Sequence, residues 1–145
     1  MDALCLVGKK KLNGKTLLDI ANPLDFSRVM PPTLSISNID SLAEQIQSEF
    51  PKVMVVKGLN TMNCSIMVNP DIIPGDHNVF LSGNYEGSKL LIRTILLDMG
   101  WKDRMIIDLG DVSTSRGTEM LLPLWIRLMG TLGTPEFNFL IARNS

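Results

Sequence analysis

Two asparagines, Asn22 and Asn60, stand where a side-chain amide could recognise a ligand. Each follows a segment predicted to be a strand, residues 16–20 for the first and residues 53–57 for the second. In a parallel sheet both would lie at the carboxyl ends of strands, where open α/β sheets bind ligands. An amide offers a donor and an acceptor, which suits a carboxamide or a ribose hydroxyl. Because asparagine also favours turns, a role in stabilising two turns is an equal alternative.

A phosphate-binding turn is the next chemistry to consider. The segment Gly83-Asn84-Tyr85-Glu86-Gly87-Ser88 lies between a predicted strand and a predicted helix, where a glycine-rich turn can hold a pyrophosphate. It lacks a middle glycine, and Glu86 would place a carboxylate where a phosphate should lie. We therefore expect an ordinary tight loop here.

The other chemistry-bearing side chains form no recognisable set. His77 is the only histidine, and the composition of its loop is typical of a solvated turn. No base can be named for Cys64, so a buried or incidental thiol is the simpler interpretation. Asp108, Asp111 and Glu119 could form a carboxylate group, but Asp111 before three hydroxyl residues is typical of a helix cap. We name no catalytic residue and no metal ligand.

The elements that must position these residues alternate between β-branched runs and helical periods. The prediction is strands over residues 16–20, 53–57, 79–82, 105–109 and 137–142, and helices over residues 38–49, 86–99 and 117–130. Two strand–helix–strand units of this kind predict an α/β fold with a mixed, mainly parallel sheet. Residues 61–78 show no helical period and are predicted to be a long loop.

The amino-terminal segment reads as a fragment of a larger pattern. Residues 3–7 are mostly apolar and three lysines follow at 9–11, which is typical of the end of an amphipathic helix. A helix of that length is marginal alone. We expect that a further strand and helix belong before it.

Composition excludes several classes of protein. The 145 residues suit a single domain, and a formal net charge of -1 gives no reason to expect nucleic acid or an anionic membrane as partner. The apolar residues 120–132 fall short of the about 20 that a membrane helix needs. The two cysteines suit a reducing compartment, so we expect a cytoplasmic protein. Because residues 117–130 are apolar almost all round, we expect a homo-oligomer or another pairing through that helix.

Six blocks of the sequence, in order, resemble a known family. They are GKTLLDIANPL at residues 14–24, VVKGLNT at 55–61, VFLSG at 79–83, LDMGW at 97–101, DLGD at 108–111 and FNF at 137–139. Together they resemble the deazaflavin-coenzyme-dependent NADP reductase family, whose relatives include the NADPH-binding domains of six-transmembrane ferric reductases.

The resemblance implies a Rossmann-type NADP oxidoreductase that passes hydride between NADP(H) and a flavin-like small-molecule acceptor, with the chemistry residing in the cofactor. It also implies that Asn22 and Pro23 lie beside the nicotinamide, that Asn60 lines the same cleft near the acceptor, and that Lys57 is a neighbour. The family's glycine-rich turn has no counterpart in this sequence. Residues 1–145 would then be the carboxyl-terminal portion of such a domain, binding NADP weakly or not at all. The alternative is a non-catalytic interaction or dimerisation module derived from such a reductase.

Overall fold

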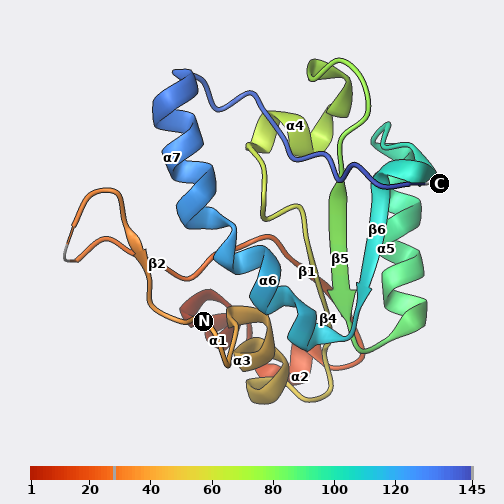
Figure 1. Cartoon of the computed structure of the whole chain (residues 1–145). Helices are drawn as coiled ribbons and strands as arrows, with labels where there is room; N and C mark the ends of the chain where they lie inside the picture. Colours follow the sequence, from red (N-terminus) through yellow and green to blue (C-terminus); the bar gives the residue numbers. More distant parts are fainter. Residues whose placement is uncertain (28, 145) are drawn as a thin grey trace.

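A four-stranded sheet forms the centre of the protein (Figure 1). The structure is a computed structural model and describes residues 1–27 and 29–144. The strands are β1 (Thr16–Asp19), β4 (Met54–Gly58), β5 (Val79–Gly83) and β6 (Ile106–Gly110), and they lie side by side in that order. β1 and β4 are parallel, as are β5 and β6, whereas β4 and β5 are antiparallel. The predicted α/β class with a mixed, mainly parallel sheet is confirmed.

Each parallel pair is connected through a helix, as the two predicted units require. α3 (Leu42–Glu49) lies between β1 and β4 in the chain, and α5 (Glu86–Asp98) lies between β5 and β6. α3 begins later than predicted because Ser41 is its N-cap, with the hydroxyl accepting a hydrogen bond from Glu44 N at 3.1 Å.

Successive residues of β4 face opposite sides of the sheet and so contribute to two cores. Val55 belongs to a buried cluster with Ala43 and Ile46 of α3, and Val56 belongs to another with Ile92 of α5. The continuous apolar run in the sequence therefore reflects a strand that is covered on both faces.

Residues 61–78 are not a structureless loop, so that prediction is wrong. They contain α4 (Cys64–Val68) and a 3₁₀ turn (Pro70–Ile72), both too short to show a helical period in the sequence. Asn63 caps α4, with its side-chain oxygen accepting a hydrogen bond from Ser65 N at 2.9 Å.

The predicted helix over residues 117–130 is two helices. α6 (Ser115–Met120) and α7 (Leu122–Leu132) meet at Leu121. Pro123 lies in the first turn of α7, where its missing N–H would have no helical partner in any case, so a new helix begins there. α7 ends at Gly133, whose left-handed backbone (φ 69°) forms the C-cap.

The predicted strand over residues 137–142 is an irregular tail instead. Asn78, just before β5, holds this tail with both its backbone and its side chain. Its N–H donates to Phe139 O at 2.8 Å, and its Oδ1 accepts from Ile141 N at 2.7 Å. These few bonds attach the tail to the molecule without forming a ladder.

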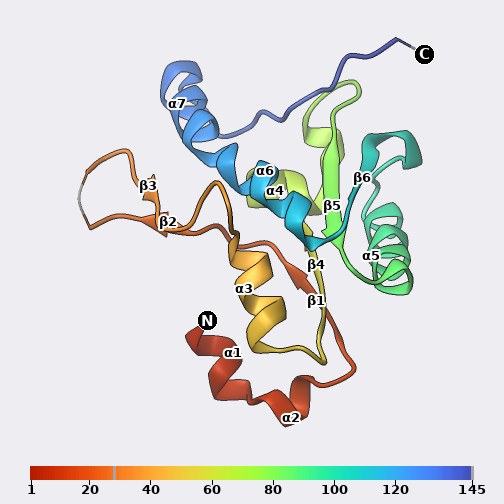
Figure 2. The same ribbon diagram turned by 60° about the horizontal axis from the view of Figure 1, so that its bottom comes forward.

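Two smaller units flank the sheet (Figure 2). The amino-terminal segment is helical, as expected, and comprises α1 (Asp2–Val7) and α2 (Lys9–Leu12), which pack on the α3 core through Leu4 and Leu12. A hairpin of β2 (Leu24–Asp25) and β3 (Thr33–Leu34) follows β1 and projects away from the sheet.

Two other features concern the described part of the chain as a whole. None of its helices is long and apolar enough to cross a membrane. Residues 1–27 and 29–144 also contain no group of three or more histidine, cysteine, aspartate or glutamate residues that could hold a metal ion.

Candidate functional site

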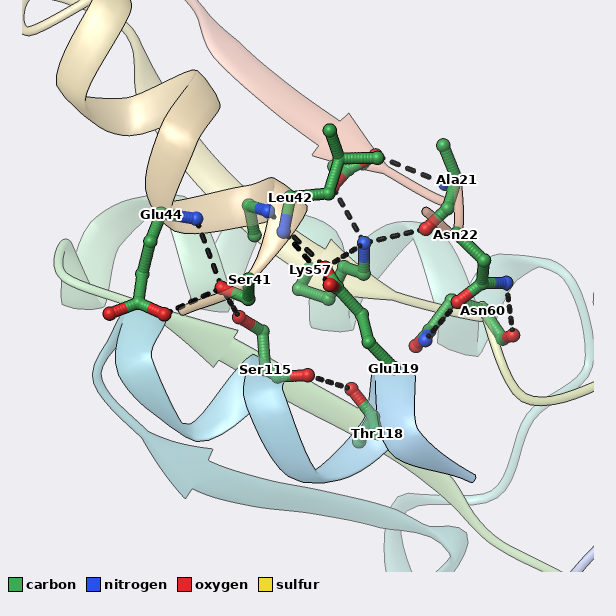
Figure 3. Close-up of polar contacts among 12 residues, drawn as sticks. Ala21, Asn22, Ser41, Leu42, Glu44, Lys57, Asn60, Ser115, Thr118 and Glu119 are labelled. Atoms are coloured by element: carbon green, nitrogen blue, oxygen red, sulfur yellow. Dashed lines mark hydrogen bonds and ion pairs between the residues drawn. The ribbon is translucent and has the colours of Figure 1, made fainter. Parts of the chain in front are cut away.

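The Asn22 and Asn60 side chains meet at one edge of the sheet and bond to each other (Figure 3). Asn60 Nδ2 donates to Asn22 Oδ1 at 2.9 Å, and Asn22 Nδ2 donates to the backbone oxygen of Asn60 at 2.8 Å. The two residues are therefore brought together as the parallel arrangement of their strands predicts. Sequence reasoning gave no indication that they bond directly.

The ends of β1 and β4 place these amides. The two strands are parallel with Asp19 opposite Lys57, so the segments that follow β1 and β4 both leave the sheet at the same edge. Immediately before Asn60, Leu59 has a left-handed backbone (φ 62°), which costs a residue with a side chain about 1–3 kcal/mol. The side chain of Leu59 is buried in the core, which holds the residue in that conformation. Strain of this kind is common at functional sites.

The amide pair keeps hydrogen-bonding capacity that the protein does not use. Each amide has two N–H groups, and each uses one of them in the pair. Within residues 1–27 and 29–144, no hydrogen bond engages Asn60 Oδ1. The pair can thus present one acceptor and two donors to a ligand.

Lys57 is buried in the protein and bonds to the turn that precedes Asn22. Its side chain is 1% exposed, and its ammonium contacts Asp19 Oδ2 at 2.8 Å, Glu119 Oε1 at 2.7 Å and Ala21 O at 2.6 Å. An ammonium has three N–H groups, so these three acceptors satisfy it completely.

Pro23 connects the site to the hairpin. Its backbone oxygen accepts hydrogen bonds from Ser35 N at 2.8 Å and from Ser35 Oγ at 3.1 Å. Since Ser35 follows β3, the base of the hairpin is attached directly to the residue after Asn22.

A surface hollow of about 520 Å³ lies between this hairpin and α7. Met30, Pro31 and Leu34 line the hairpin side, and Pro123 and Arg127 line the α7 side. In the part of the chain that the structure describes, Arg127 makes no ion pair. The hollow therefore combines apolar walls with an available cation.

Glu119 is the site residue whose role the sequence did not indicate. Its side chain is 2% exposed, and its carboxylate accepts hydrogen bonds from Leu42 N at 2.8 Å and Ala43 N at 3.2 Å, besides contacting Lys57. The sequence did contain one signal: Glu119 is a single acid in an apolar helix, and Lys57 is a single lysine in an apolar strand. Buried charges of opposite sign require partners.

The carboxylate group considered from the sequence does not assemble. Asp108 pairs with Lys89 at 2.8 Å. Asp111 forms the expected cap, accepting from Ser113 N at 2.9 Å, and the hydrogen bonds from Ser113 hold the pKa of Asp111 below its ordinary value. Neither therefore shares a site with Glu119.

Of the three other candidates, two have structural roles, and Cys64 is not the buried thiol that the sequence left open. His77 is not in a solvated turn, because it is buried, stands edge-to-face with Trp101 at 5.1 Å and has Pro70 O 3.0 Å from Nε2. Cys64 is an exposed thiol. In the turn over residues 83–88, Asn84 Oδ1 accepts a hydrogen bond from Val112 N at 3.0 Å.

Comparison with known proteins identifies the lineage. No model of a known protein family and no curated protein matches the chain. Among solved structures, a putative F420-dependent NADP-reductase from Arthrobacter sp. FB24 is 58% identical, with a TM-score of 0.94 and coverage of 98% of this chain. The chain is therefore similar to that protein over nearly all of its own length. The resemblance to deazaflavin-coenzyme-dependent NADP reductases is thereby confirmed, and the sheet corresponds to part of a Rossmann-like fold.

How much these matches show depends on the share of each protein that they cover. The chain spans 64% of the length of the Arthrobacter protein. A hypothetical protein from Sinorhizobium meliloti is 24% identical with a TM-score of 0.55, and the match covers 70% of this chain and 48% of that one. At that identity the second likeness shows a shared fold alone.

Proposed function

We propose that the chain is the carboxyl-terminal portion of an NADP-dependent oxidoreductase domain in which hydride passes between NADP(H) and a flavin-like acceptor. The 58% identity with the Arthrobacter protein supports this class of reaction. In this proposal the nicotinamide supplies the hydride chemistry, and the protein contributes binding and placement.

The observation that carries the proposal is the pairing of Asn22 with Asn60. A nicotinamide carries a carboxamide with one acceptor and two donors, and the amide pair retains an acceptor, Asn60 Oδ1, and an N–H on each residue. The donor set therefore fits a carboxamide. Asn22 and Asn60 would hold that group, with Pro23 beside it.

The described residues offer little for the phosphates of NADP at this edge. Charge-assisted hydrogen bonds are worth about 1.5–3 kcal/mol each, against about 1 kcal/mol for neutral ones. Lys57 is the cation that bonds to the turn before Asn22, and all its N–H groups are used within the protein. We therefore expect this chain alone to bind NADP weakly or not at all.

The hollow between the hairpin and α7 is the place that we assign to the acceptor. Its apolar walls suit a planar ring, and Arg127 suits an anionic substituent. Pro23, which follows Asn22 directly, is bonded to Ser35 at the base of the hairpin, so acceptor and nicotinamide would occupy neighbouring parts of one surface.

Nuclear magnetic resonance titration of the whole chain tests the nicotinamide assignment. Nicotinamide mononucleotide and NADP⁺ should shift the side-chain amide signals of Asn22 and Asn60, whereas 2′,5′-ADP, which lacks the nicotinamide, should not. In a parallel NADPH titration followed by nicotinamide fluorescence, we expect a dissociation constant weaker than micromolar. Shifts caused equally by 2′,5′-ADP, or binding of a nicotinamide compound that leaves the Asn22 and Asn60 signals unchanged, would remove the proposed role of the amides.

A second candidate function rests on α7. Leu124 and Leu132 lie on one face of this helix and are at least half exposed. An exposed apolar helix face favours association, and it supports a dimerisation module derived from a reductase as the second candidate. A second copy of the chain is the partner that we propose.

A further inference from the structure

A buried network of three charged residues adjoins the turn that carries the amide pair (Figure 3). Lys57 is at its centre, and Asp19 and Glu119 contact the ammonium at 2.8 Å and 2.7 Å. All three side chains are at most 5% exposed. The network joins β1, β4 and α6, which are far apart in the sequence.

The network carries one more negative charge than positive charge, and the protein compensates for the difference. Glu119 accepts hydrogen bonds from Leu42 N and Ala43 N, the first N–H groups of α3, where the helix dipole favours an anion. Asp19 Oδ1 accepts from Ala21 N at 3.0 Å. Every charged group in the network therefore has hydrogen-bonded partners.

The third acceptor on Lys57 connects this network to the site. Lys57 Nζ donates to Ala21 O at 2.6 Å, and Ala21 is bonded covalently to Asn22. Asp19 holds the other side of the same turn through Ala21 N. The turn that carries the Asn22 amide is thus fixed at two backbone atoms by side chains of the network.

We infer that Glu119, acting through Lys57, is a positioning residue for the Asn22–Asn60 amide pair. The Glu119 carboxylate anchors the ammonium, the ammonium holds Ala21 O, and this backbone contact sets the direction of the Asn22 side chain. The consequence for ligand binding rests on the proposed function, whereas the consequence for the amides does not.

The effect of the network on the position of the amides can be measured separately from its effect on the stability of the protein. Removing one partner leaves an unpaired buried charge and is strongly destabilising, whereas replacing the whole set with well-packed apolar side chains of similar volume is often neutral or stabilising. Here the side chains that replace Asp19 and Glu119 must stay polar, because each has to keep an acceptor for the backbone N–H groups that bond to it. The informative variant is therefore Asp19→Asn, Lys57→Met and Glu119→Gln together. It removes all three charges and keeps the side chains near their original size, but it also removes the donor to Ala21 O.

The experiment compares side-chain amide spectra of the full-length wild type and this triple variant. We expect the variant to melt near the wild-type temperature while hydrogen exchange at the Asn22 amide becomes about tenfold faster, the equivalent of losing one good hydrogen bond. A single Glu119→Gln variant, which loses the charge and keeps one acceptor oxygen for Lys57 and the two backbone N–H groups of α3, should change the same amide signals. Folded variants with unchanged Asn22 and Asn60 signals would overturn the inference.

A matched control lies on the same two helices. Glu44 of α3 pairs with Arg116 of α6, with Arg116 Nε 2.8 Å from Glu44 Oε2, but neither contacts Lys57. Glu44→Gln should leave the amide signals unchanged. An equal change in this control would mean that any loosening of α3 from α6 disturbs the pair, and the specific role of Glu119 would be lost.

Titration with nicotinamide mononucleotide separates this inference from the proposed function. If the wild type binds it, the triple variant should bind about tenfold more weakly. If the wild type binds it without any change in the Asn22 and Asn60 signals while the variant amides exchange faster, the positioning role stands and the proposed function fails. If both bind equally with equal amide signals, the positioning role fails and the proposed function stands.

Discussion

At the scale of single residues, Asn22 and Asn60 act as one hydrogen-bonded unit. Two bonds connect them, at 2.8 Å and 2.9 Å, and Asn60 is almost completely buried. Replacing either residue removes or weakens both bonds, so the energetic effects of the two replacements must be coupled.

A double-mutant cycle measures this coupling. We expect Asn22→Ala and Asn60→Ala each to lower the free energy of unfolding by about 1–2 kcal/mol, and the double variant to lose much less than the sum. Urea denaturation of the four proteins gives the values. As a control, Asn22→Ala combined with Asn84→Ala should be additive, because Asn84 bonds to Val112 instead. An additive result for Asn22 with Asn60 would contradict the pairing.

The ion pair between Glu44 and Arg116 predicts a pH dependence of stability. The hydrogen bond from Arg116, with burial acting in the opposite direction, holds the pKa of Glu44 below its ordinary value of 4.5. A lowered folded-state pKa contributes stability above the ordinary value, and this contribution is lost as pH falls through the lowered value. The stability difference between wild type and Arg116→Met should therefore shrink below pH 4.5.

Melting temperatures of wild type and variant from pH 7 down to about pH 3 check this prediction. Arg143→Met is the control, because Arg143 makes no ion pair among the described residues. That variant should differ from the wild type by the same small amount at every pH. A difference for Arg116→Met that grows in acid would have the wrong sign.

At the scale of elements, the antiparallel junction of β4 with β5 is the least usual part of the sheet. Gly83 ends β5 opposite Val56, and a Cβ atom built on it would lie 2.8 Å from Val55 O. The two strands therefore approach each other more closely there than a side chain would permit.

Replacement by alanine should have opposite effects on stability at Gly83, which lies at this junction, and at Gly87, which lies outside it. Gly83→Ala must displace backbone and should lower the free energy of unfolding by about 1–3 kcal/mol. Gly87→Ala, in the first turn of α5 with nothing within 4 Å of its Cβ, should be neutral or stabilise by up to about 1 kcal/mol. Thermal or urea unfolding of both variants decides the matter, and a tolerated Gly83→Ala would show that the strands can separate.

Elements with strong local signals were predictable from the sequence, and those defined by few residues were not. β1, β4 and α5 follow from apolar runs and helical periods, whereas α3 is capped at Ser41 and so begins later than the start predicted at residue 38. α4 is too short to show a period, and the break between α6 and α7 depends on Pro123 within an unbroken apolar stretch. The tail over residues 137–142 is apolar like a strand, but it is held by hydrogen bonds to Asn78 and by stacking of Phe137 on Trp125 instead of by a ladder.

The position of the candidate site was predictable from the sequence, but the contacts between its residues were not. Strand order brought Asn22 and Asn60 to one edge because parallel strands end together. The contact between Lys57 and Glu119 joins residues from distant elements, and spacing along the chain carries no information about such a contact. Only the general rule that buried charges need partners pointed towards it.

At the scale of the whole molecule, α7 and the hairpin stand away from the sheet (Figure 2). Leu124, Leu128 and Leu132 follow a helical spacing, and two of them are at least half exposed. Burial of an apolar residue of this size is worth about 1.5–3 kcal/mol, so a second copy could cover this face with a clear gain.

Light scattering over a range of concentrations tests this association. We expect the wild type to form dimers, and Leu124→Glu with Leu132→Glu to be monomeric because two carboxylates cannot be buried in the interface. Ile39→Glu, at an exposed apolar residue just before α3, should still dimerise. A wild type that remains monomeric at high concentration would rule out self-association.

The left-handed backbone at Leu59 has a consequence for any laboratory evolution of this protein. Glycine would remove the conformational cost but would leave a void in the core, and a β-branched residue would fill the space but resist the dihedral angle. Few amino acids meet both demands, so a randomised library should hold this position constant. The library should vary the hairpin instead, because the acceptor site that we propose there carries no such conflict.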